Sequence, residues 1–303
     1  MGITANALHF PGRIGLGTWP MGESPVQRDQ EIAAVTHALD IGYRLLDTAE
    51  SYGDGGAERI IGSALKAFGA ARRSELFIVS KVMPNNATRN GISRACEASI
   101  QRMGSDYLDL YLLHWPAAGG PDRFTETLTG FGDLRRRGLI RHFGVSNFYE
   151  DDLRLWLKTE QRLGLSAATQ CNQVTYSAEA RGIEHGLLAW QRVHGIKTMA
   201  YSPLGRGSMT QHPLLAQLGR ERGVSAAQIA LAWCVREPDV VATPRSTNLL
   251  HLEQNLRAAD LRLSPGELKQ IDQAFLLRFR WVRQNSLLRQ TRSAVRQLLR
   301  RRK

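Results

Sequence analysis

Short apolar segments rich in β-branched residues alternate along this chain with longer segments of helical periodicity. An alternation of this kind predicts strands that are separated by helices. The predicted strands are Ile14–Thr18, Arg44–Asp47, Phe77–Lys81, Leu108–His114, Arg141–Ser146, Thr169–Gln173, Lys197–Tyr201 and Val240–Thr243. The predicted helices are Asp29–Leu39, Ala57–Lys66, Thr88–Met103, Arg123–Arg137, Asp151–Leu163, Arg181–His194 and Ser225–Arg236, with Thr88 and Ser225 as N-caps.

Most of these repeats take roughly thirty residues, the length of a βα unit. Eight such units predict a (β/α)₈ barrel over residues 1–275, and the chain length of 303 residues suits one barrel domain. A dinucleotide-binding Rossmann domain is disfavoured, because no G-x-G-x-x-G turn follows the first strand. Gly15 and Gly17 lie within or beside that strand and open no helix.

Each predicted strand ends in, or shortly before, polar or aromatic residues. Because the carboxyl ends of barrel strands converge on one face, where barrel enzymes carry their active sites, we expect a functional site there. The residues at these ends are, in order, Thr18-Trp19, Asp47, Lys81, His114, Ser146-Asn147, Gln173, Tyr201-Ser202 and Arg245-Ser246.

Four of the residues at this face suit proton transfer. Asp47 would hold Lys81 charged, and the ammonium would lower the pKa of the nearby Tyr52 phenol and make it a better acid. His114 would donate a hydrogen bond to a substrate oxygen. Each residue also has an interpretation without a catalytic role. The stretch from Asp47 to Tyr52 would be a surface turn, Lys81 a solvated strand end, and His114 a core histidine bonded to the backbone.

Composition narrows the alternatives. The chain is 43% hydrophobic and 22% charged, as soluble globular proteins are. No apolar run approaches the roughly 20 residues of a membrane span, and residues 1–8 have no signal-peptide character. Three widely spaced cysteines point to a reducing compartment, so we expect a cytoplasmic protein. The sequence has no G-x-S-x-G turn, no carboxylate pair suited to glycoside hydrolysis and no metal-ligand spacing of its histidines.

The chain resembles the aldo-keto reductase family, and within it the bacterial reductases of methylglyoxal and similar small aldehydes. The resemblance covers residues from about 10 to 275. The segments that carry it are Gly17-Thr18-Trp19, Asp47-Thr48-Ala49 with Tyr52, Lys81, His114, Gly144-Val145-Ser146-Asn147, Asn172-Gln173, Ala200-Tyr201-Ser202-Pro203-Leu204 and Pro244-Arg245-Ser246.

The resemblance implies an NADPH-dependent reduction of small aldehydes and ketones in which Tyr52 is the general acid. Asp47 and Lys81 would tune Tyr52, and His114 would orient the carbonyl group. Trp19 and Trp115 would wall the substrate pocket together with Tyr52 and His114. Ser146, Asn147 and Gln173 would hold the cofactor carboxamide, and Tyr201 would stack on the nicotinamide. The remaining cofactor contacts implied by the resemblance are Thr18, Trp19, Asp47, Ser202, Pro203, Leu204, Gln254 and Asn255.

The segment after the last strand is expected to recognise the 2′-phosphate of the cofactor. Arg245, Ser246, Thr247 and Asn248 stand where the family places a basic residue and hydroxyl groups, and an arginine fork suits a phosphate. The chain departs from the family here: His251 stands where many members have a second arginine, and Gln254 where many have glutamate. NADPH remains the expected cofactor.

The last residues, 276–303, do not match the family. The formal net charge of the chain is +12, and residues 278–303 hold ten Arg or Lys and no acid, so 12 − 10 leaves +2 for the rest. The basic character is therefore a property of the tail, and no nucleic-acid-binding domain is indicated. Leu287, Leu288, Thr291, Val295, Leu298 and Leu299 repeat with a helical period. The tail is expected to be a basic amphipathic helix. It would either be solvated without a partner, lie on an anionic membrane surface, bind an acidic partner, or bind nucleic acid weakly and without sequence preference.

Two other functions remain open at the level of sequence. A monomeric barrel of this kind would also serve as an NADPH-binding sensor that docks through its tail, although a sensor has no need of all four proton-transfer residues. A lyase that forms a Schiff base on Lys81 is disfavoured, because Asp47 should keep that amine protonated.

Overall fold

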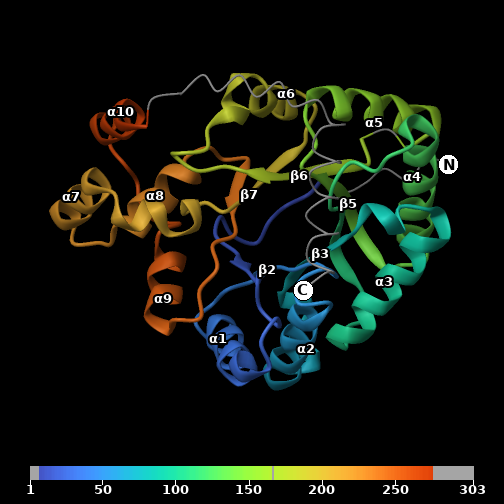
Figure 1. Ribbon diagram of the computed structural model, residues 1–303, viewed down its shortest axis with the longest axis horizontal. Helices are drawn as coiled ribbons and strands as arrows, with labels where there is room; N and C mark the ends of the chain where they lie inside the picture. Colours follow the sequence, from blue (N-terminus) through green and yellow to red (C-terminus); the bar gives the residue numbers. More distant parts are fainter. Residues whose placement is uncertain (1–6, 166, 276–303) are drawn as a thin grey trace, which may run out of the picture.

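Eight parallel strands follow one another around the sheet of the computed structural model, which describes residues 7–165 and 167–275. The sheet closes on itself, because Ile14 bridges Ala242 in parallel and the Gly15 amide donates to the Ala242 carbonyl at 2.8 Å. The protein is therefore a (β/α)₈ barrel (Figure 1). Its strands are β1 (Leu16–Gly17), β2 (Leu45–Asp47), β3 (Phe77–Val82), β4 (Leu108–Leu113), β5 (Ile140–Ser146), β6 (Thr169–Thr175), β7 (Lys197–Tyr201) and β8 (Val240–Ala242).

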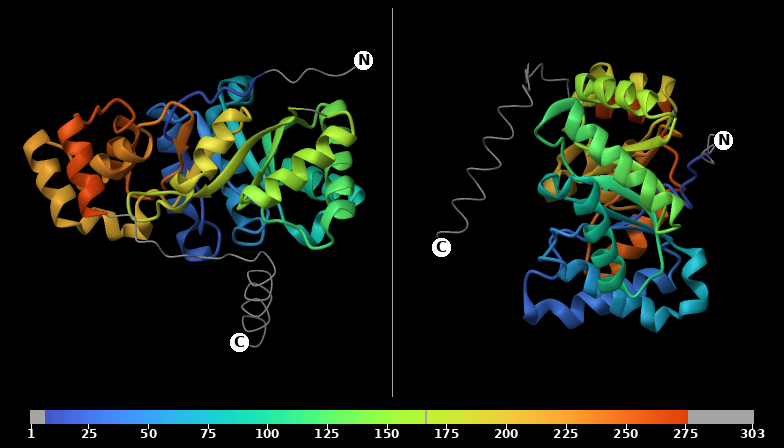
Figure 2. Two further views of the ribbon diagram at one scale, coloured as in Figure 1. Left: turned by 90° about the horizontal axis from the view of Figure 1, so that it is seen from above. Right: turned by 90° about the vertical axis from the view of Figure 1, so that its right-hand side faces the viewer.

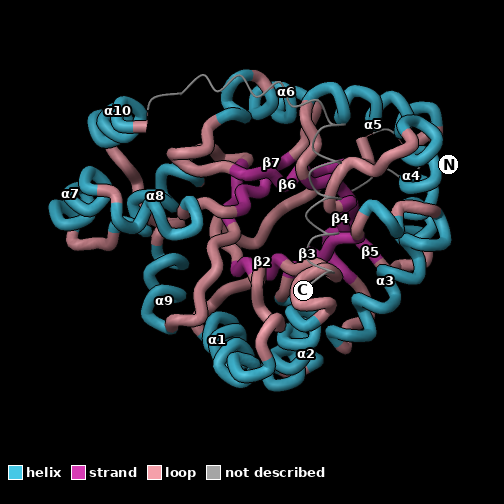
Figure 3. Tube along the Cα trace, in the orientation of Figure 1, coloured by secondary structure: helices cyan, strands magenta, loops and turns pink. Residues whose placement is uncertain are grey.

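Helices surround the strands, as the tube drawing shows (Figure 3). The helices that follow β7 and β8, drawn in orange to red, lie together at one side of the barrel (Figure 2). The helices are α1 (Arg28–Asp40), α2 (Gly56–Phe68), α3 (Arg89–Met103), α4 (Gly120–Arg136), α5 (Glu150–Arg162), α6 (Leu187–Val193), α7 (Pro213–Arg222), α8 (Ala226–Cys234), α9 (Leu249–Arg257) and α10 (Pro265–Ala274).

The predicted strands are all confirmed, with ends that differ by one or two residues at most. The predicted helix Arg181–His194 is wrong as a single element. It is a 3₁₀ turn, Gly182–His185, followed by α6, and Gly186 between them has φ 145°, which no helix accommodates. The N-caps are confirmed: the hydroxyls of Thr88 and Ser225 accept from backbone amides in the first turns of α3 and α8. Helices α7, α9 and α10 were not predicted.

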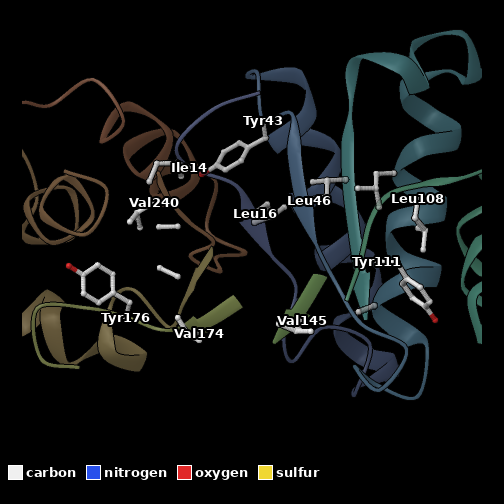
Figure 4. Packing of buried hydrophobic residues seen from close by; sticks show 14 of the residues in the cluster. Ile14, Leu16, Tyr43, Leu46, Leu108, Tyr111, Val145, Val174, Tyr176 and Val240 are labelled. Carbon is white, nitrogen blue, oxygen red and sulfur yellow. The ribbon is translucent and has the colours of Figure 1, made fainter. Parts of the chain in front are cut away.

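Two apolar layers hold the barrel together. The inner layer fills the barrel with the alternate residues that point inward from the strands, among them Leu45, Val79 and Leu110. The outer layer lies between the strands and the helices and includes Leu46, Tyr111 and Val145, whose side chains are seen in Figure 4. Burial on both faces explains why the strands read as continuous apolar runs, which the sequence pattern also shows.

Gly144 in β5 offers a test of this packing next to the functional face. A Cβ atom there would lie 2.3 Å from the Cys171 carbonyl oxygen of the neighbouring strand β6. Gly144→Ala should therefore destabilise the fold by about 1–3 kcal/mol, the usual cost of overpacking. The measurement is the midpoint of chemical unfolding.

Gly182→Ala is the matched control, because a Cβ atom at Gly182 would meet nothing within 4 Å and its φ is ordinary. It should change stability by less than about 0.5 kcal/mol. Equal midpoints for the two variants would contradict the packing described for β5 and β6.

The predicted basic tail, residues 276–303, lies outside the described residues. Within the described part of the chain, no helix combines the length and the apolar character that crossing a bilayer requires.

Candidate active site

A cavity of about 980 Å³ opens at the carboxyl ends of the strands. It collects almost every residue that the sequence analysis placed at this face. The predicted residues that line it are Thr18, Trp19, Asp47, Tyr52, His114, Trp115, Ser146, Asn147, Gln173, Tyr201, Ser202, Pro203, Leu204, Arg245, Ser246, Gln254 and Asn255. Three predicted residues do not line it: Lys81 is fully buried beneath the surface, and Thr247 and Asn248 lie beyond its edge.

Lys81 connects the two other groups of the predicted acid. Its Nζ donates to Asp47 Oδ1 at 2.8 Å and to Tyr52 Oη at 3.2 Å, and a third bond to the Thr48 carbonyl measures 2.7 Å. The Tyr52 and His114 rings meet edge to face, with centroids 5.8 Å apart. The structure thus brings all four residues together, which excludes the interpretation of Lys81 as a solvated strand end.

The strand register explains why Asp47 and Lys81 meet. Asp47 ends β2 and pairs with Val79 of β3. Because side chains alternate along a strand, Lys81, two residues further on, points to the same inner side of the barrel as Val79. A lysine at that position cannot reach solvent, so its ammonium forms an ion pair with the Asp47 carboxylate of the adjacent strand.

The loop that carries Tyr52 is fixed from two sides. Glu50 Oε1 accepts from the Met83 amide at 2.7 Å and from Asn86 Nδ2 at 3.0 Å, which ties the loop to the segment after β3. On the other side Gly22, with φ 78°, packs so closely that a Cβ atom there would lie 2.4 Å from the Gly56 carbonyl carbon. The position of the phenol is therefore set by the fold before any ligand binds.

Lys81 lowers the pKa of Tyr52, as expected, but the net shift of that pKa is upward, so the phenol is not the stronger acid that the sequence predicted. Burial raises the pKa of Tyr52, the Lys81 ammonium lowers it, and the Asp47 carboxylate raises it, so that the pKa lies above its usual value. Removing the phenolate from water outweighs the attraction of the ammonium. Tyr52 therefore remains protonated at neutral pH, and Lys81 reduces the cost of forming the phenolate without inverting it.

Lys81 and His114 differ in charge at neutral pH: the lysine is positively charged and the histidine is neutral. Burial lowers the pKa of Lys81, but the Asp47 carboxylate and Tyr52 more than compensate, so that the pKa is raised and the amine remains an ammonium. This disfavours a Schiff-base role. Burial, aided by the Lys81 charge, holds the pKa of His114 well below its usual value, so its imidazole is neutral. His114 Nδ1 is buried and has no hydrogen-bond partner within residues 7–165 and 167–275, so the interpretation of His114 as a core histidine bonded to the backbone through its ring is not supported at that atom.

A chain of amides and hydroxyls continues from the tetrad along the cavity. Gln173 Nε2 donates to Asp47 Oδ1 at 2.8 Å, and Ser146 Oγ donates to the Gln173 carbonyl at 2.9 Å. Asn147 Nδ2 donates to Ser146 Oγ at 3.0 Å, and Asn147 Oδ1 accepts from the Tyr201 hydroxyl at 2.8 Å. These bonds orient the amide side chains in advance, at the point where β5, β6 and β7 end.

The segment after β8 contains a cation, Arg245, that forms no ion pair with any residue the structure describes. Arg245 is exposed and lines the cavity, three residues beyond the end of β8 at Ala242 rather than directly at the strand end. Ser246 Oγ accepts from the Asn248 amide at 3.0 Å, and Asn248 Oδ1 accepts from the His251 amide at 3.1 Å as the cap of α9. Asn248 is thus engaged in beginning a helix.

Several lining residues were missed by the sequence analysis. Arg206 belongs to η5 (Gly205–Gln211), the 3₁₀ segment after β7, and Ser225–Ala227 begin α8. Arg206 stands two residues after Leu204 of the Ser202-Pro203-Leu204 segment, so its proximity to that segment was the available signal. Ser225 was recognised as a cap only, because nothing in the sequence shows that the start of α8 faces the cavity. The described residues contain no group of His, Cys, Asp or Glu that could hold a metal ion.

Comparisons with known proteins agree on one family. The sequence profile of the Aldo/keto reductase family matches residues 13–275. The methylglyoxal reductase YeaE of Escherichia coli is 40% identical over 270 residues, which are 86% of this chain and 90% of that protein.

Two solved structures of aldo-keto reductases from Klebsiella pneumoniae are also similar. One, in complex with NADP and acetate, is 40% identical with a TM-score of 0.81, and the match covers 87% of this chain and 91% of that one. The other, in complex with NADPH, is 40% identical with a TM-score of 0.79 over 87% and 90% of the two chains.

Proposed function

Because this chain belongs to the Aldo/keto reductase family, we propose that it reduces small aldehydes and ketones with NADPH and that Tyr52 is the proton donor. The observation that carries the proposal is the contact of Lys81 Nζ with both Asp47 Oδ1 and Tyr52 Oη at the floor of the cavity. Similarity to a methylglyoxal reductase and to NADP-bound structures supports the choice of substrate class and cofactor.

The residues of the cavity fit a nicotinamide dinucleotide. Gln173 Oε1 and the second lone pair of Asn147 Oδ1 are acceptors suited to a carboxamide NH₂ group, and Tyr201 offers its ring beside them. Arg245 provides a cationic fork for the 2′-phosphate, with Ser246 and Thr247 adjacent. When bound, the cofactor supplies the hydride that the side chains of this protein cannot supply.

The remaining chemistry is the work of the protein. Tyr52 holds its proton at neutral pH and donates it to the carbonyl oxygen as negative charge develops there. The phenolate that forms gains the full attraction of the Lys81 ammonium, which lies within hydrogen-bond distance. Because this attraction is stronger for the phenolate than for the phenol, it lowers the barrier rather than only strengthening binding.

His114 serves as a neutral donor and orienting group. Its pKa is far too low for an imidazolium at neutral pH, so it polarises the substrate oxygen through a hydrogen bond and leaves protonation to Tyr52. Asn147 Nδ2 donates to the His114 carbonyl at 3.0 Å, which ties this residue to the cofactor-binding segment. Trp19 and Trp115, which are 48% and 37% exposed, form the outer walls of the substrate pocket.

The proposed activity is tested by following the absorbance of NADPH with a panel of small carbonyl compounds that includes methylglyoxal. We expect consumption of NADPH that depends on the carbonyl compound, together with formation of the corresponding alcohol. Binding of NADPH without turnover of any compound in the panel would contradict the proposal.

Arg245 should determine the preference between the two nicotinamide cofactors. Arg245→Ala is expected to lower kcat/KM for NADPH by about 10- to 100-fold, the effect of losing a charged hydrogen bond, and to leave the value for NADH nearly unchanged. The measurement is the ratio of kcat/KM for NADPH and NADH in the wild type and the variant. An unchanged ratio would remove Arg245 from 2′-phosphate recognition.

The pH profile of reduction should have no limb near neutral pH. The raised pKa of Tyr52 keeps its proton in place until the solution is alkaline, and the lowered pKa of His114 keeps that ring neutral from mildly acidic pH upward. We therefore expect kcat at saturating NADPH to be flat through the neutral range and to fall only as pH rises through the pKa of Tyr52. A loss of kcat with a midpoint near neutral pH would contradict this assignment.

A further inference from the structure

The segment after β7 holds an arginine in an unfavourable backbone conformation. Arg206 has φ 58° and ψ 31°, in the left-handed region that favours glycine. A non-glycine residue pays about 1 kcal/mol or more for this conformation, and such residues recur at ligand-binding sites. The guanidinium carbon of Arg206 lies 5.4 Å from the centroid of the Trp19 ring. The strained backbone thus places a cation over an aromatic wall of the cavity.

Arg206 makes no ion pair within the described residues, although a carboxylate lies close by. Glu179 Oε2 accepts instead from Ser208 Oγ at 2.6 Å, and a Cβ atom at Gly205 would lie 2.8 Å from the same oxygen. Two further bonds hold the turn, from the Gly207 amide to Leu204 and from Ser208 Oγ to Gly205, both at 2.9 Å. The turn is therefore held by hydrogen bonds on both sides of Arg206, and the Glu179 carboxylate is engaged by Ser208.

The cavity has an excess of positive charge on the side where Trp19 lies. Asp47 is the one acid among the described residues that line it, and that carboxylate is already bound by Lys81 and Gln173. Trp19 is joined to the tetrad through its neighbour Thr18, whose Oγ1 donates to the Asp47 carbonyl at 3.0 Å. Arg206 is thus an exposed cation that lines the same cavity, lies over Trp19 and has no carboxylate partner among the described residues.

We propose that Arg206 determines substrate specificity by binding a carboxylate of the substrate, so that small aldehydes and ketones with a negative charge are preferred over neutral ones. The inference rests on the proposed carbonyl reduction and names the substrate class within it. A guanidinium held over the face of an indole keeps its edge N–H groups available, and these match the two oxygens of a carboxylate.

The test compares a four-carbon aldehyde acid, succinic semialdehyde, with its uncharged methyl ester. In the wild type, kcat/KM should be higher for the acid than for the ester. Arg206→Gln should lower the acid-to-ester ratio by about 10- to 100-fold, as expected for the loss of one charged hydrogen-bond pair, with the ester little affected. Arg206→Lys keeps the charge but loses the guanidinium fork, so its acid-to-ester ratio should lie between those of the wild type and Arg206→Gln.

Arg245→Gln is the matched control, since it removes the other arginine among the described residues that line the cavity. At saturating NADPH it should leave the acid-to-ester ratio unchanged, while Arg206→Gln should leave the Kd for NADPH, followed by fluorescence quenching, unchanged. An acid-to-ester ratio that does not fall in Arg206→Gln overturns the inference, as does a wild type that prefers the ester. If Arg206→Gln instead weakens NADPH binding at an unchanged ratio, the guanidinium serves the cofactor phosphates and the inference is wrong. A wild type that reduces no carbonyl compound rejects the proposed function itself.

Discussion

Tyr52→Phe should reduce kcat for carbonyl reduction by about 10³-fold or more, within the range typical of a lost general acid. The phenylalanine ring keeps the edge-to-face contact with His114 but has no proton to donate and no oxygen for Lys81 to contact. NADPH binding should survive, because the phenol makes none of the contacts proposed to hold the cofactor. The measurements are kcat and, by fluorescence quenching, the Kd for NADPH.

His114→Gln is an informative companion to that variant. The glutamine side chain retains a neutral donor, in keeping with the neutral imidazole that burial and Lys81 produce. It should lose less activity than Tyr52→Phe, with a larger share of the loss in KM. Near-normal kcat in Tyr52→Phe would remove the phenol from proton transfer, and a loss of NADPH binding would show that the variant had damaged the cavity.

Lys81→Met should impair both the rate and the fold. The side chain is completely buried, and its ammonium is bound by Asp47, Tyr52 and the Thr48 carbonyl. Removing it leaves the Asp47 carboxylate without its counter-ion in the barrel, which typically costs about 3–5 kcal/mol of stability. The pKa of Tyr52 should rise further, and kcat should fall by about 10²- to 10⁴-fold. Chemical unfolding and kcat are the two measurements.

The double variant Lys81→Met with Asp47→Asn separates these effects. With both charges removed, no buried carboxylate is left unpaired, so much of the lost stability should return. The rate should stay low, because the phenolate still has no ammonium beside it. Recovery of the rate along with stability would indicate that Lys81 acts only as a structural residue.

The positions of the strands and the four proton-transfer residues were predictable because both depend on local pattern. Parallel barrel strands are buried on two faces and read as apolar runs, and their ends must meet at one face, so Asp47, Lys81 and His114 could be brought together without coordinates. Ser146, Asn147 and Gln173 stand at strand ends as well, and the family segments then supplied their expected role in holding the cofactor. The prediction of one helix over Arg181–His194 was wrong because Gly186 interrupts it. The helical spacing of the apolar residues on both sides of Gly186 did not reveal the turn that it makes.

The rest depends on quantities that a sequence does not express. The pKa of Tyr52 depends on its burial and on two charges of opposite sign, Lys81 and Asp47. Burial has the largest effect, and a sequence does not show how deeply the phenol is buried. Arg206 was missed for a similar reason: its place at the cavity depends on a left-handed turn, next to which Ser208 is bonded to Glu179. Neither has a signature in the sequence beyond a glycine on each side of the arginine.

The most direct test of the account is a single turnover of the wild-type protein with methylglyoxal and NADPH that carries deuterium at the reactive C4 position. Mass analysis of the product should find the deuterium on the carbon of the former carbonyl group, with the new hydroxyl proton taken from the protein and solvent. Bound NADPH that keeps its deuterium while methylglyoxal remains unreduced would contradict a hydride-transfer enzyme and leave only a cofactor-binding barrel.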